Sequence, residues 1–177
     1  NYPYLRYLAK TESAIIISSG MANIHEITKA IKLLESEGAK NVILLHCISI
    51  YPAAPELINL NHIRFLKESF PNITIGYSDH TLGIEVPIAA IAMGATVIEK
   101  HFILDKNIGG PDAHFSLDEK EFTEMVNAVR KAEEMMGVVD YKMTEKKKKS
   151  RQFSRSLFIV KDVKSGEKIT NENVRSI

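Results

Sequence analysis

The sequence has little of several residue types, and each shortage excludes a class of protein. Only one of its 177 residues, Cys47, is cysteine, so no disulfide framework holds the fold and a reducing compartment suits it. No apolar run reaches the ~18 residues of a membrane span, and no signal-peptide pattern opens the chain. The formal net charge is +1, so no field of one sign attracts nucleic acid or a membrane surface. These absences favour a cytoplasmic protein.

The remaining composition is that of an ordinary globular protein. Apolar residues make up 45% of the chain and charged residues 25%, which is the balance found in soluble folded domains. A length of 177 residues is enough for one domain or for parts of two. The chain begins with Asn1 rather than methionine, so its start carries no information about targeting. Composition therefore indicates a class of protein but no chemistry.

The chain up to about Met136 alternates short apolar runs with amphipathic stretches. The runs are rich in Ile, Val and Leu, as expected for strands of a parallel sheet that are buried on both faces. We expect four strands, at residues 14–18, 41–46, 73–77 and 96–101. Helices are expected from Ile24 to about Leu34, from about Ile58 to Glu68, from about Glu85 to Met93, and from Asp118 onward. The last helix is expected to bury Phe122, Met125, Val126 and Val129.

Four strand–helix units in succession predict an α/β fold. The two standard folds with this pattern are the (βα)8 barrel and the doubly wound open sheet. Four units make only half of a barrel, and a half-barrel leaves two open sheet edges. We therefore expect four earlier units to precede residues 1–137 in a barrel.

The strand–helix rhythm stops after this region. Residues 138–152 include four consecutive lysines and are predicted to be a solvated linker rather than a nucleic-acid patch. An apolar run at Ser156–Val160 predicts a strand, residues 165–166 predict a turn, and Thr170 is suited to cap a short helix. Residues 153–177 are therefore predicted to begin a second, small, β-rich domain.

Three of the six histidines, His46, His80 and His101, lie at or just past predicted strand ends. Functional groups of parallel βα folds gather at these positions. Because His80 and His101 end adjacent strands, their imidazoles are candidates to bind one metal ion, with a carboxylate available from Asp112. The alternative is that these are core histidines with satisfied hydrogen bonds. His46 lies within an apolar strand and favours that alternative.

Small hydroxyl side chains suggest an anion site. Ser18 lies beside a glycine before a predicted helix, and Ser78 precedes the turn into another. Hydroxyls and backbone N–H groups at helix N-termini suit phosphate, although the same hydroxyls are equally suited to cap the helices. Cys47 adjoins His46 in the chain, but neighbours on a strand point to opposite faces. A buried thiol is therefore favoured over a Cys–His catalytic pair.

Five motifs in a fixed order make the pattern specific. They are Ile17–Met21, Leu45–Pro52, Ile75–Gly83, Ile98–Phe102 and Gly110–Asp112. In this order they resemble the sialic acid synthase family, which includes N-acetylneuraminate, legionaminate and pseudaminate synthases and spore-coat polysaccharide synthases. Residues Arg155–Leu157 and Asp162–Thr170 resemble the opening of that family's antifreeze-like (SAF) C-terminal domain. The resemblance covers essentially the whole chain.

The resemblance implies a fold and a metal site. The family folds as a (βα)8 TIM barrel followed by the SAF domain, so this chain would hold the C-terminal half of the barrel, strands five to eight, and the start of the SAF domain. Family positions that bind a divalent ion, usually Mn²⁺ with Mg²⁺ or Co²⁺ as alternatives, match His80 and His101. With Asp112, these are the residues that the resemblance makes catalytic. Family members are homodimers in which the small domain covers the partner's barrel mouth.

The resemblance also implies a reaction and its substrates. Phosphoenolpyruvate condenses with an N-acylated amino sugar, either N-acetylmannosamine-like or a 2,4-diacetamido-trideoxyhexose, and gives a nonulosonic (sialic-type) acid and phosphate. The metal would polarise the sugar aldehyde, which C3 of phosphoenolpyruvate attacks; water then adds at C2 and phosphate leaves. Family phosphate contacts match Ser18 and Ser78, and family sugar contacts match Ser49, Tyr51 and Asp112.

Departures from the family pattern limit what this chain can do. The family's phosphate-binding lysines and an acidic catalytic residue lie on earlier strands, and an arginine that reaches the partner's sugar would fall just beyond Ile177. We therefore expect this chain to be inactive by itself. Ser49 stands where the best-known bacterial N-acetylneuraminate type carries asparagine, which leaves the acceptor sugar open. Rival interpretations are another phosphoenolpyruvate or aldol barrel enzyme with a different acceptor, and a non-catalytic sugar-phosphate binding protein.

Overall fold

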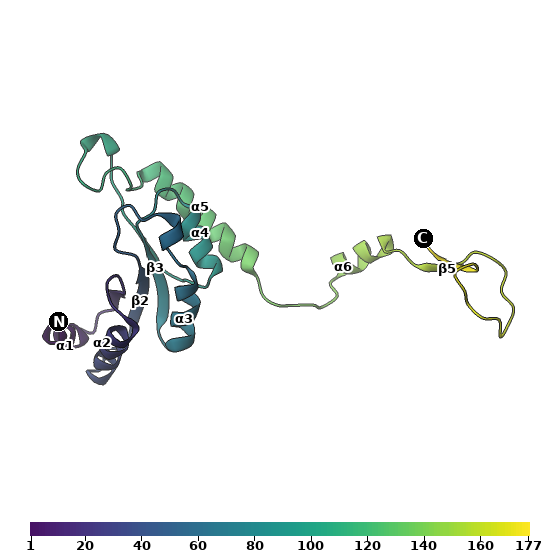
Figure 1. Cartoon of the computed structure of the whole chain (residues 1–177), viewed down its shortest axis with the longest axis horizontal. Coiled ribbons are helices and arrows are strands. Elements are labelled where there is room, and N and C mark those ends of the chain that lie inside the picture. The colour runs from purple at the N-terminus through teal and green to yellow at the C-terminus, as the bar shows by residue number, and fades with distance from the viewer. The chain divides into compact units, whose positions relative to one another are not determined.

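The four predicted apolar runs form four parallel strands in the computed structural model, which describes all 177 residues (Figure 1). The chain divides into two compact units, Asn1–Gly137 and Val138–Ile177. The elements of the first unit are α1 (Tyr2–Ala9), β1 (Ile15–Ser18), α2 (Ile24–Ser36), β2 (Val42–Cys47), α3 (Asn61–Ser69), β3 (Thr74–Asp79), α4 (Glu85–Ala92), β4 (Ile98–Lys100) and α5 (Glu119–Met136), with short 3₁₀ helices at Pro55–Leu57 and Lys106–Ile108. No helix combines the length and apolar character needed to cross a membrane.

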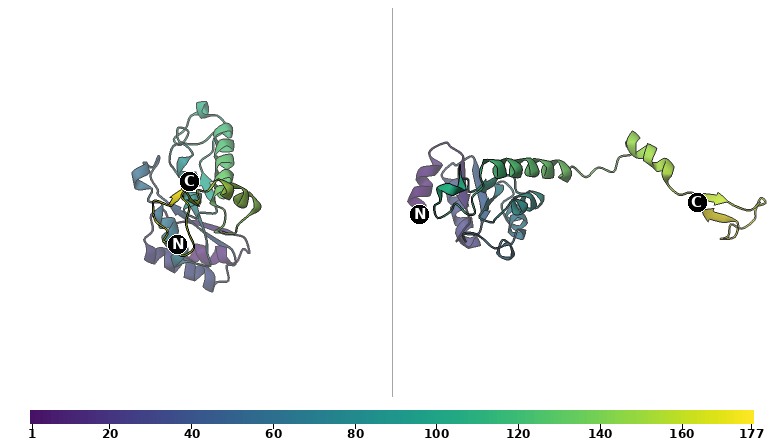
Figure 2. Two further views of the ribbon diagram at one scale, coloured as in Figure 1. Left: turned by 90° about the vertical axis from the view of Figure 1, so that its right-hand side faces the viewer. Right: turned by 90° about the horizontal axis from the view of Figure 1, so that it is seen from above.

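The sheet of the first unit adds its strands in chain order, β1-β2-β3-β4, and every pair is parallel. A doubly wound sheet reverses its strand order at a switch point, whereas a barrel adds strands in one direction. The α/β prediction is therefore confirmed, and the strand order is that of a curled half-barrel. Figure 2 shows this sheet and its helices from two further sides.

The strand limits differ from the prediction at the end where the site lies. β3 continues to Asp79, two residues past the predicted end, and β4 stops at Lys100. β4 is short because the chain beyond it pairs with a later loop: Leu117 N–H donates to the His101 carbonyl and Ile103 N–H to the Leu117 carbonyl. This pairing holds the loop from residue 101 to 117 close to the sheet.

One face of the sheet carries the main hydrophobic core. Leu44, Ile75 and Tyr77 pack there against side chains of α2 and α3, including Leu34 and Ile63. Side chains on a strand alternate between faces, so Ile43, Leu45, Gly76 and Ser78 point to the opposite, inner face. Ile16, on this inner face of β1, is 53% exposed. The inner face is therefore only partly covered within this chain.

Local sequence signals explain most helix limits. α2 begins with a capping box in which the Asn23 side chain accepts from Glu26 N–H and the Glu26 carboxylate accepts from Asn23 N–H. Gly38 follows its end with a φ of 90°, a conformation that favours glycine. Asp118 and Glu121 form an equivalent box at the start of α5.

Two helix predictions need correction, and one helix was not predicted. α3 begins at Asn61 rather than near Ile58, because the preceding chain turns at Asn59 with a φ of 46°. The predicted burial of Val126 on α5 is wrong, since this side chain is 40% exposed. α5 buries only Met125 and Ala132, which lie two helical turns apart and form a narrow buried stripe. The N-terminal helix α1 was not predicted.

The second unit contains α6 (Glu145–Ser150), a 3₁₀ helix at Arg151–Phe153, and the strands β5 (Leu157–Ile159) and β6 (Val174–Ser176). α6 thus lies within the segment predicted to be a linker. β5 confirms the predicted strand and pairs antiparallel with β6. The helix expected after Thr170 is wrong: Asn173 Oδ1 accepts from Thr170 N–H and Glu172 N–H donates to Thr170 Oγ, so the chain turns and enters β6.

Candidate active site

The two candidate metal ligands lie side by side where β3 and β4 end. Asp79, the last residue of β3, is the register partner of Lys100, the last residue of β4, and His80 and His101 directly follow them in the chain. Their ring centroids are 5.2 Å apart and the rings are inclined at 71°. The structure therefore brings together the two histidines that were predicted to bind one metal ion from their positions after adjacent strands.

His80 is buried and its ring is held by the loop after β2. Its Nδ1 lies 3.0 Å from the carbonyl oxygen of Ile48. Because a carbonyl oxygen only accepts, this nitrogen carries the proton and Nε2 keeps a free lone pair. The Cys47 thiol lies 3.9 Å from the same Nδ1. A carbonyl that fixes the tautomer of an imidazole is the usual outer partner of a metal-bound histidine.

His101 is more open and faces a carboxylate. Its Nδ1 lies 3.7 Å from Asp112 Oδ2, and about half of the Asp112 side chain is exposed. Phe115 packs against the His101 ring with a centroid distance of 4.8 Å. The loop that β4 and Leu117 hold near the sheet thus supplies both the carboxylate and an apolar wall.

Tyr51 covers the histidine pair from the loop after β2. Its ring centroid lies 4.3 Å from that of His80 and 6.0 Å from that of His101. The ring of Phe115 also lies 6.0 Å from that of Tyr51. Two imidazoles and two aromatic rings therefore form one cluster, built from three segments far apart in the sequence.

The donor set fits partial coordination of a divalent ion. Two imidazoles on adjacent strand ends, one with a free Nε2, are suitable nitrogen ligands. The chain contains no group of three or more His, Cys, Asp and Glu side chains placed to hold a metal ion. The remaining coordination positions would therefore be filled from outside this set of side chains.

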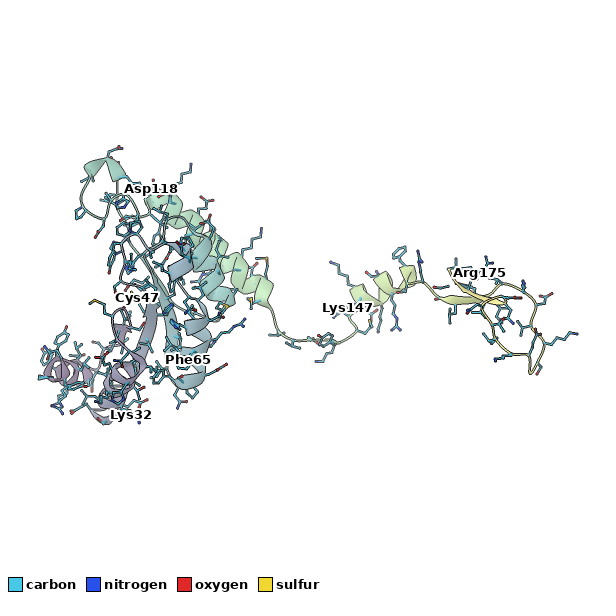
Figure 3. All side chains as sticks on the ribbon, in the orientation of Figure 1. Lys32, Cys47, Phe65, Asp118, Lys147 and Arg175 are labelled. Carbon is cyan, nitrogen blue, oxygen red and sulfur yellow. The ribbon has the colours of Figure 1, made fainter.

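Two of the predicted substrate-binding serines gather around Gly20. Ser18 Oγ accepts a hydrogen bond from Gly20 N–H at 3.3 Å. A Cβ at position 20 would collide with Ser49 Oγ, so only glycine leaves room for that hydroxyl. Ser49 Oγ also lies 3.9 Å from the Cys47 thiol (Cys47 is labelled in Figure 3). Small polar groups from β1 and β2 thus converge on the same end of the sheet as the histidine pair.

Ser78 has a carboxylate partner that was not singled out from the sequence. Its hydroxyl is buried and donates to Glu99 Oε1 at 2.7 Å. Ser78 and Glu99 are register partners, and each lies two residues before one of the site histidines. The alternation of strand residues would have located Glu99, because it shares a face with His101. A substrate phosphate that accepted a hydrogen bond from the Ser78 hydroxyl would have to displace the Glu99 carboxylate from it.

His46 lies outside this cluster, on the core face of β2. Its Nε2 lies 2.7 Å from the Ile58 carbonyl, and its ring is 5.1 Å from that of His62. Burial lowers the pKa of His46, and the neighbouring His62 lowers it further, against the opposing effect of the Ile58 hydrogen bond. His46 is therefore a neutral core histidine.

Tyr77 is a second buried polar group on that face. Its hydroxyl has no hydrogen-bond partner. Burial, and then the negative charge of Asp79, raise the pKa of Tyr77, so the phenol stays protonated.

Comparison with known proteins gives consistent matches. The model of the NeuB family matches residues 1–141. A pseudaminic acid synthase of Campylobacter jejuni is 44% identical over 174 residues, which are 98% of this chain and 50% of that protein. An N,N'-diacetyllegionaminic acid synthase of the same species is 43% identical over 177 residues, covering 98% of this chain and 53% of that protein.

A solved structure gives the same result. The N-acetylneuraminic acid synthetase of Leptospira borgpetersenii, in complex with citrate, superposes with a TM-score of 0.78 at 32% identity, over 85% of this chain and 52% of that one. The chain spans about half the length of the curated relatives it matches.

Proposed function

Because the chain belongs to the NeuB family, we propose that it forms part of the active site of a nonulosonic acid synthase. The relatives are named as synthases of pseudaminic, diacetyllegionaminic and N-acetylneuraminic acids. The proposed reaction joins phosphoenolpyruvate to an N-acylated amino sugar and releases phosphate. Since the chain covers about half of these relatives, the activity is proposed for the whole protein.

The observation that carries the proposal is the imidazole pair beneath Tyr51. His80 and His101 would hold a divalent ion, with Mn²⁺ as the first choice and Mg²⁺ or Co²⁺ as alternatives. When bound, the ion would make the sugar's aldehyde carbon electrophilic. The Ile48 carbonyl keeps the His80 proton on Nδ1, so Nε2 is free to bind the ion.

Asp112 and Tyr51 are the proposed contacts for the sugar. The half-exposed Asp112 carboxylate, 3.7 Å from His101 Nδ1, can accept a hydrogen bond from a sugar hydroxyl beside the imidazole pair. Tyr51 packs against both imidazoles and offers the sugar an aromatic surface. Holding the two reactants together in one orientation is expected to be the main contribution of these groups to the rate.

Ser18, Ser49 and Ser78 are the proposed contacts for phosphoenolpyruvate and the sugar. Ser18 and Ser49 lie around Gly20, whose missing side chain leaves room for the Ser49 hydroxyl beside that of Ser18. In the reaction C3 of phosphoenolpyruvate forms a bond to the aldehyde carbon, water adds at C2, and the C2–O bond to phosphate breaks. Hydroxyl and N–H donors near the departing phosphate would stabilise its charge.

Residues 153–177 are proposed to open an antifreeze-like domain, and the whole protein is proposed to form a homodimer. The apolar side chains of β5, Leu157, Phe158 and Ile159, are all exposed in this chain. A two-stranded pair is marginally stable alone. These side chains therefore suit a larger domain that packs on its own remainder or on a second copy.

Phosphate release from phosphoenolpyruvate tests the proposed function. We expect the whole protein to release phosphate with Mn²⁺ and one member of a panel of N-acylated hexosamines. His80→Ala and His101→Ala should each lower the rate at least 100-fold, because each removes one of two protein ligands of the ion. A coupled colorimetric phosphate assay measures this.

His25→Ala is the matched control, since it removes an exposed imidazole on α2. It should retain the full rate. Release that persists in both site variants would contradict the assigned metal ligands. If wild type releases no phosphate with any amino sugar, the function moves to another aldehyde acceptor or to a binding role.

A further inference from the structure

A buried ion pair lies directly behind the two site histidines. Lys100 Nζ lies 2.6 Å from Asp79 Oδ2, and the side chains are 1% and 0% exposed. The two residues are register partners on β4 and β3. Each is followed in the chain by one of the two histidines, so the ion pair joins the two strands at the residues directly before His80 and His101.

The same ammonium group also ties down the residue after His80. Lys100 Nζ donates to the Thr81 carbonyl oxygen at 2.5 Å. Thr81 N–H and Oγ–H both donate to Asp79 Oδ1, at 3.0 Å and 2.9 Å. The residues before and after His80 are thus both bonded to one side chain of β4.

His80 consequently has two independent anchors. Its ring is bonded to Ile48, which follows β2, while its flanking residues are bonded to Lys100 on β4. The spacing between His80 and His101 depends on the second anchor, because His101 follows Lys100 directly. Without that anchor, His80 would be positioned by the β2 loop alone.

Stability alone does not account for a charge pair at this depth. Removing two charges from water is costly, and replacing a buried pair by apolar residues of similar volume is often neutral or stabilising. Removing one partner is strongly destabilising, because the other charge remains buried and unpaired. Unlike apolar packing, the pair fixes the position of β3 relative to β4, because it joins one defined atom of each strand.

We propose that Asp79 and Lys100 are positioning residues, which set the separation and inclination of the His80 and His101 imidazoles for binding one divalent ion. The inference rests on the proposed function for the identity of the ligand. Lys100 touches neither substrate nor metal in this role; it acts through the residues on both sides of His80.

The double substitution Asp79→Asn with Lys100→Met tests the proposal, because it leaves no unpaired charge and the amide oxygen introduced at position 79 still accepts from the two Thr81 donors. In the whole protein, we expect a melting temperature close to that of wild type. Calorimetry with Mn²⁺ alone should show binding weakened roughly 10- to 100-fold, the range found when outer partners of metal ligands are removed. In the metal-free protein, NMR should show a weaker nuclear Overhauser effect between the two imidazoles.

Lys106→Met is the matched control. Lys106 Nζ forms a partly exposed ion pair of the same length, 2.6 Å, with Glu121 at the start of α5, and contacts neither Asp79 nor the residues that flank His80. It should leave both the Mn²⁺ affinity and the Overhauser effect between the imidazoles unchanged. Wild-type Mn²⁺ affinity together with an unchanged Overhauser effect in the double variant would overturn the proposal.

The outcome separates this proposal from the proposed function. A wild-type protein that binds Mn²⁺ but releases no phosphate would refute the synthase reaction, while the affinity difference would still decide the role of the ion pair. If wild type binds no Mn²⁺, the Overhauser effect in the metal-free protein decides. An effect of wild-type strength in the double variant then overturns the proposal, and a weaker effect supports it.

Discussion

The buried histidines differ in which ring nitrogen they offer. His80 donates through Nδ1 to Ile48 and keeps Nε2 free, whereas His46 donates through Nε2 to Ile58. Both acceptors are backbone carbonyls in the segment between β2 and α3. Residue type and strand position were enough to select His80 and His101, but no sequence pattern predicts which carbonyl meets which nitrogen. The tautomers therefore follow from the path of one loop.

His46 should make the stability of the fold pH-dependent. Its pKa in the folded chain is lowered from the ordinary 6.5, with burial as the main cause. Well above pH 6.5 the ring is neutral whether the chain is folded or not, so it adds no pH dependence there. Below that pH the unfolded chain binds a proton more readily, and the free energy of unfolding falls by at most about 1.4 kcal/mol per pH unit until the folded ring is protonated too.

The variant that isolates this effect is His46→Gln, whose amide N–H can still donate to the Ile58 carbonyl. Urea unfolding at pH 7.5 and pH 5.5 should show a smaller loss of stability in the variant than in wild type. His25→Gln, at an exposed position on α2, should behave as wild type. An equal loss in all three proteins would show that His46 does not titrate with folding.

The limits of helices could be predicted where one face of the segment is apolar and a capping residue precedes it in the sequence. α2 and α5 satisfy both conditions; each begins within a residue of its predicted start, capped by Asn23 and by Asp118. α3 has no side-chain cap, and its start depends on a preceding 3₁₀ turn. The end of β4 depends on pairing with Leu117, which is distant in the chain. The periodicity of apolar residues within a segment cannot predict limits that are set by such contacts.

The site shows the same division between local and distant information. The histidine pair and the serines follow from strand ends, which the apolar runs mark. The Ser78–Glu99 pair and the Asp79–Lys100 pair require the register of β3 against β4. The register of parallel strands is set by the packing of strand–helix units and not by a short turn. It therefore cannot be predicted from the sequence of either strand alone.

Gly76 should be the position at which the sheet tolerates substitution least. It lies in the centre of β3, where a Cβ would come within 2.7 Å of the Val97 carbonyl oxygen and 2.8 Å of Val97 Cβ. Backbone cannot move aside without breaking the β3–β4 register. Gly76→Ala should therefore lower the free energy of unfolding by about 3 kcal/mol, at the upper end for overpacking. Chemical denaturation measures this.

Gly20→Ala provides the comparison, because its added Cβ would collide with a single hydroxyl, Ser49 Oγ. A side chain can rotate away, so the loss of stability should be below about 1 kcal/mol. Equal losses at positions 20 and 76 would contradict the view that β4 closes tightly on β3.

At the scale of the whole molecule, the chain is two units with different degrees of internal support. The first unit has a parallel sheet and a hydrophobic core, whereas the second has one antiparallel pair whose apolar residues are exposed. The composition predicted neither the division nor its position. The loss of strand–helix rhythm near Met136 did indicate where the first unit ends, because periodic apolar residues are what a core requires.

Limited proteolysis should reveal this division. Val138–Lys142 has neither helix nor strand, and Tyr141 within it is 92% exposed. Proteases cut exposed segments that can leave their backbone hydrogen bonds at little cost. Chymotrypsin should therefore cut after Tyr141 well before it cuts after Tyr77, which is fully buried in β3. Mass spectrometry of timed samples should show a persistent fragment ending at residue 141.

Tyr141→Ser is the control for the assignment of that cut. It should remove the fragment ending at residue 141 and leave Phe153, which is also exposed, as the next site of cleavage in this region. Early cleavage after Tyr77 would contradict a stable first unit, since the protease would then be reaching the centre of the sheet. A chain that resists cleavage at both Tyr141 and Phe153 would instead show that the second unit is covered in solution, as a domain that packs on a second copy would be.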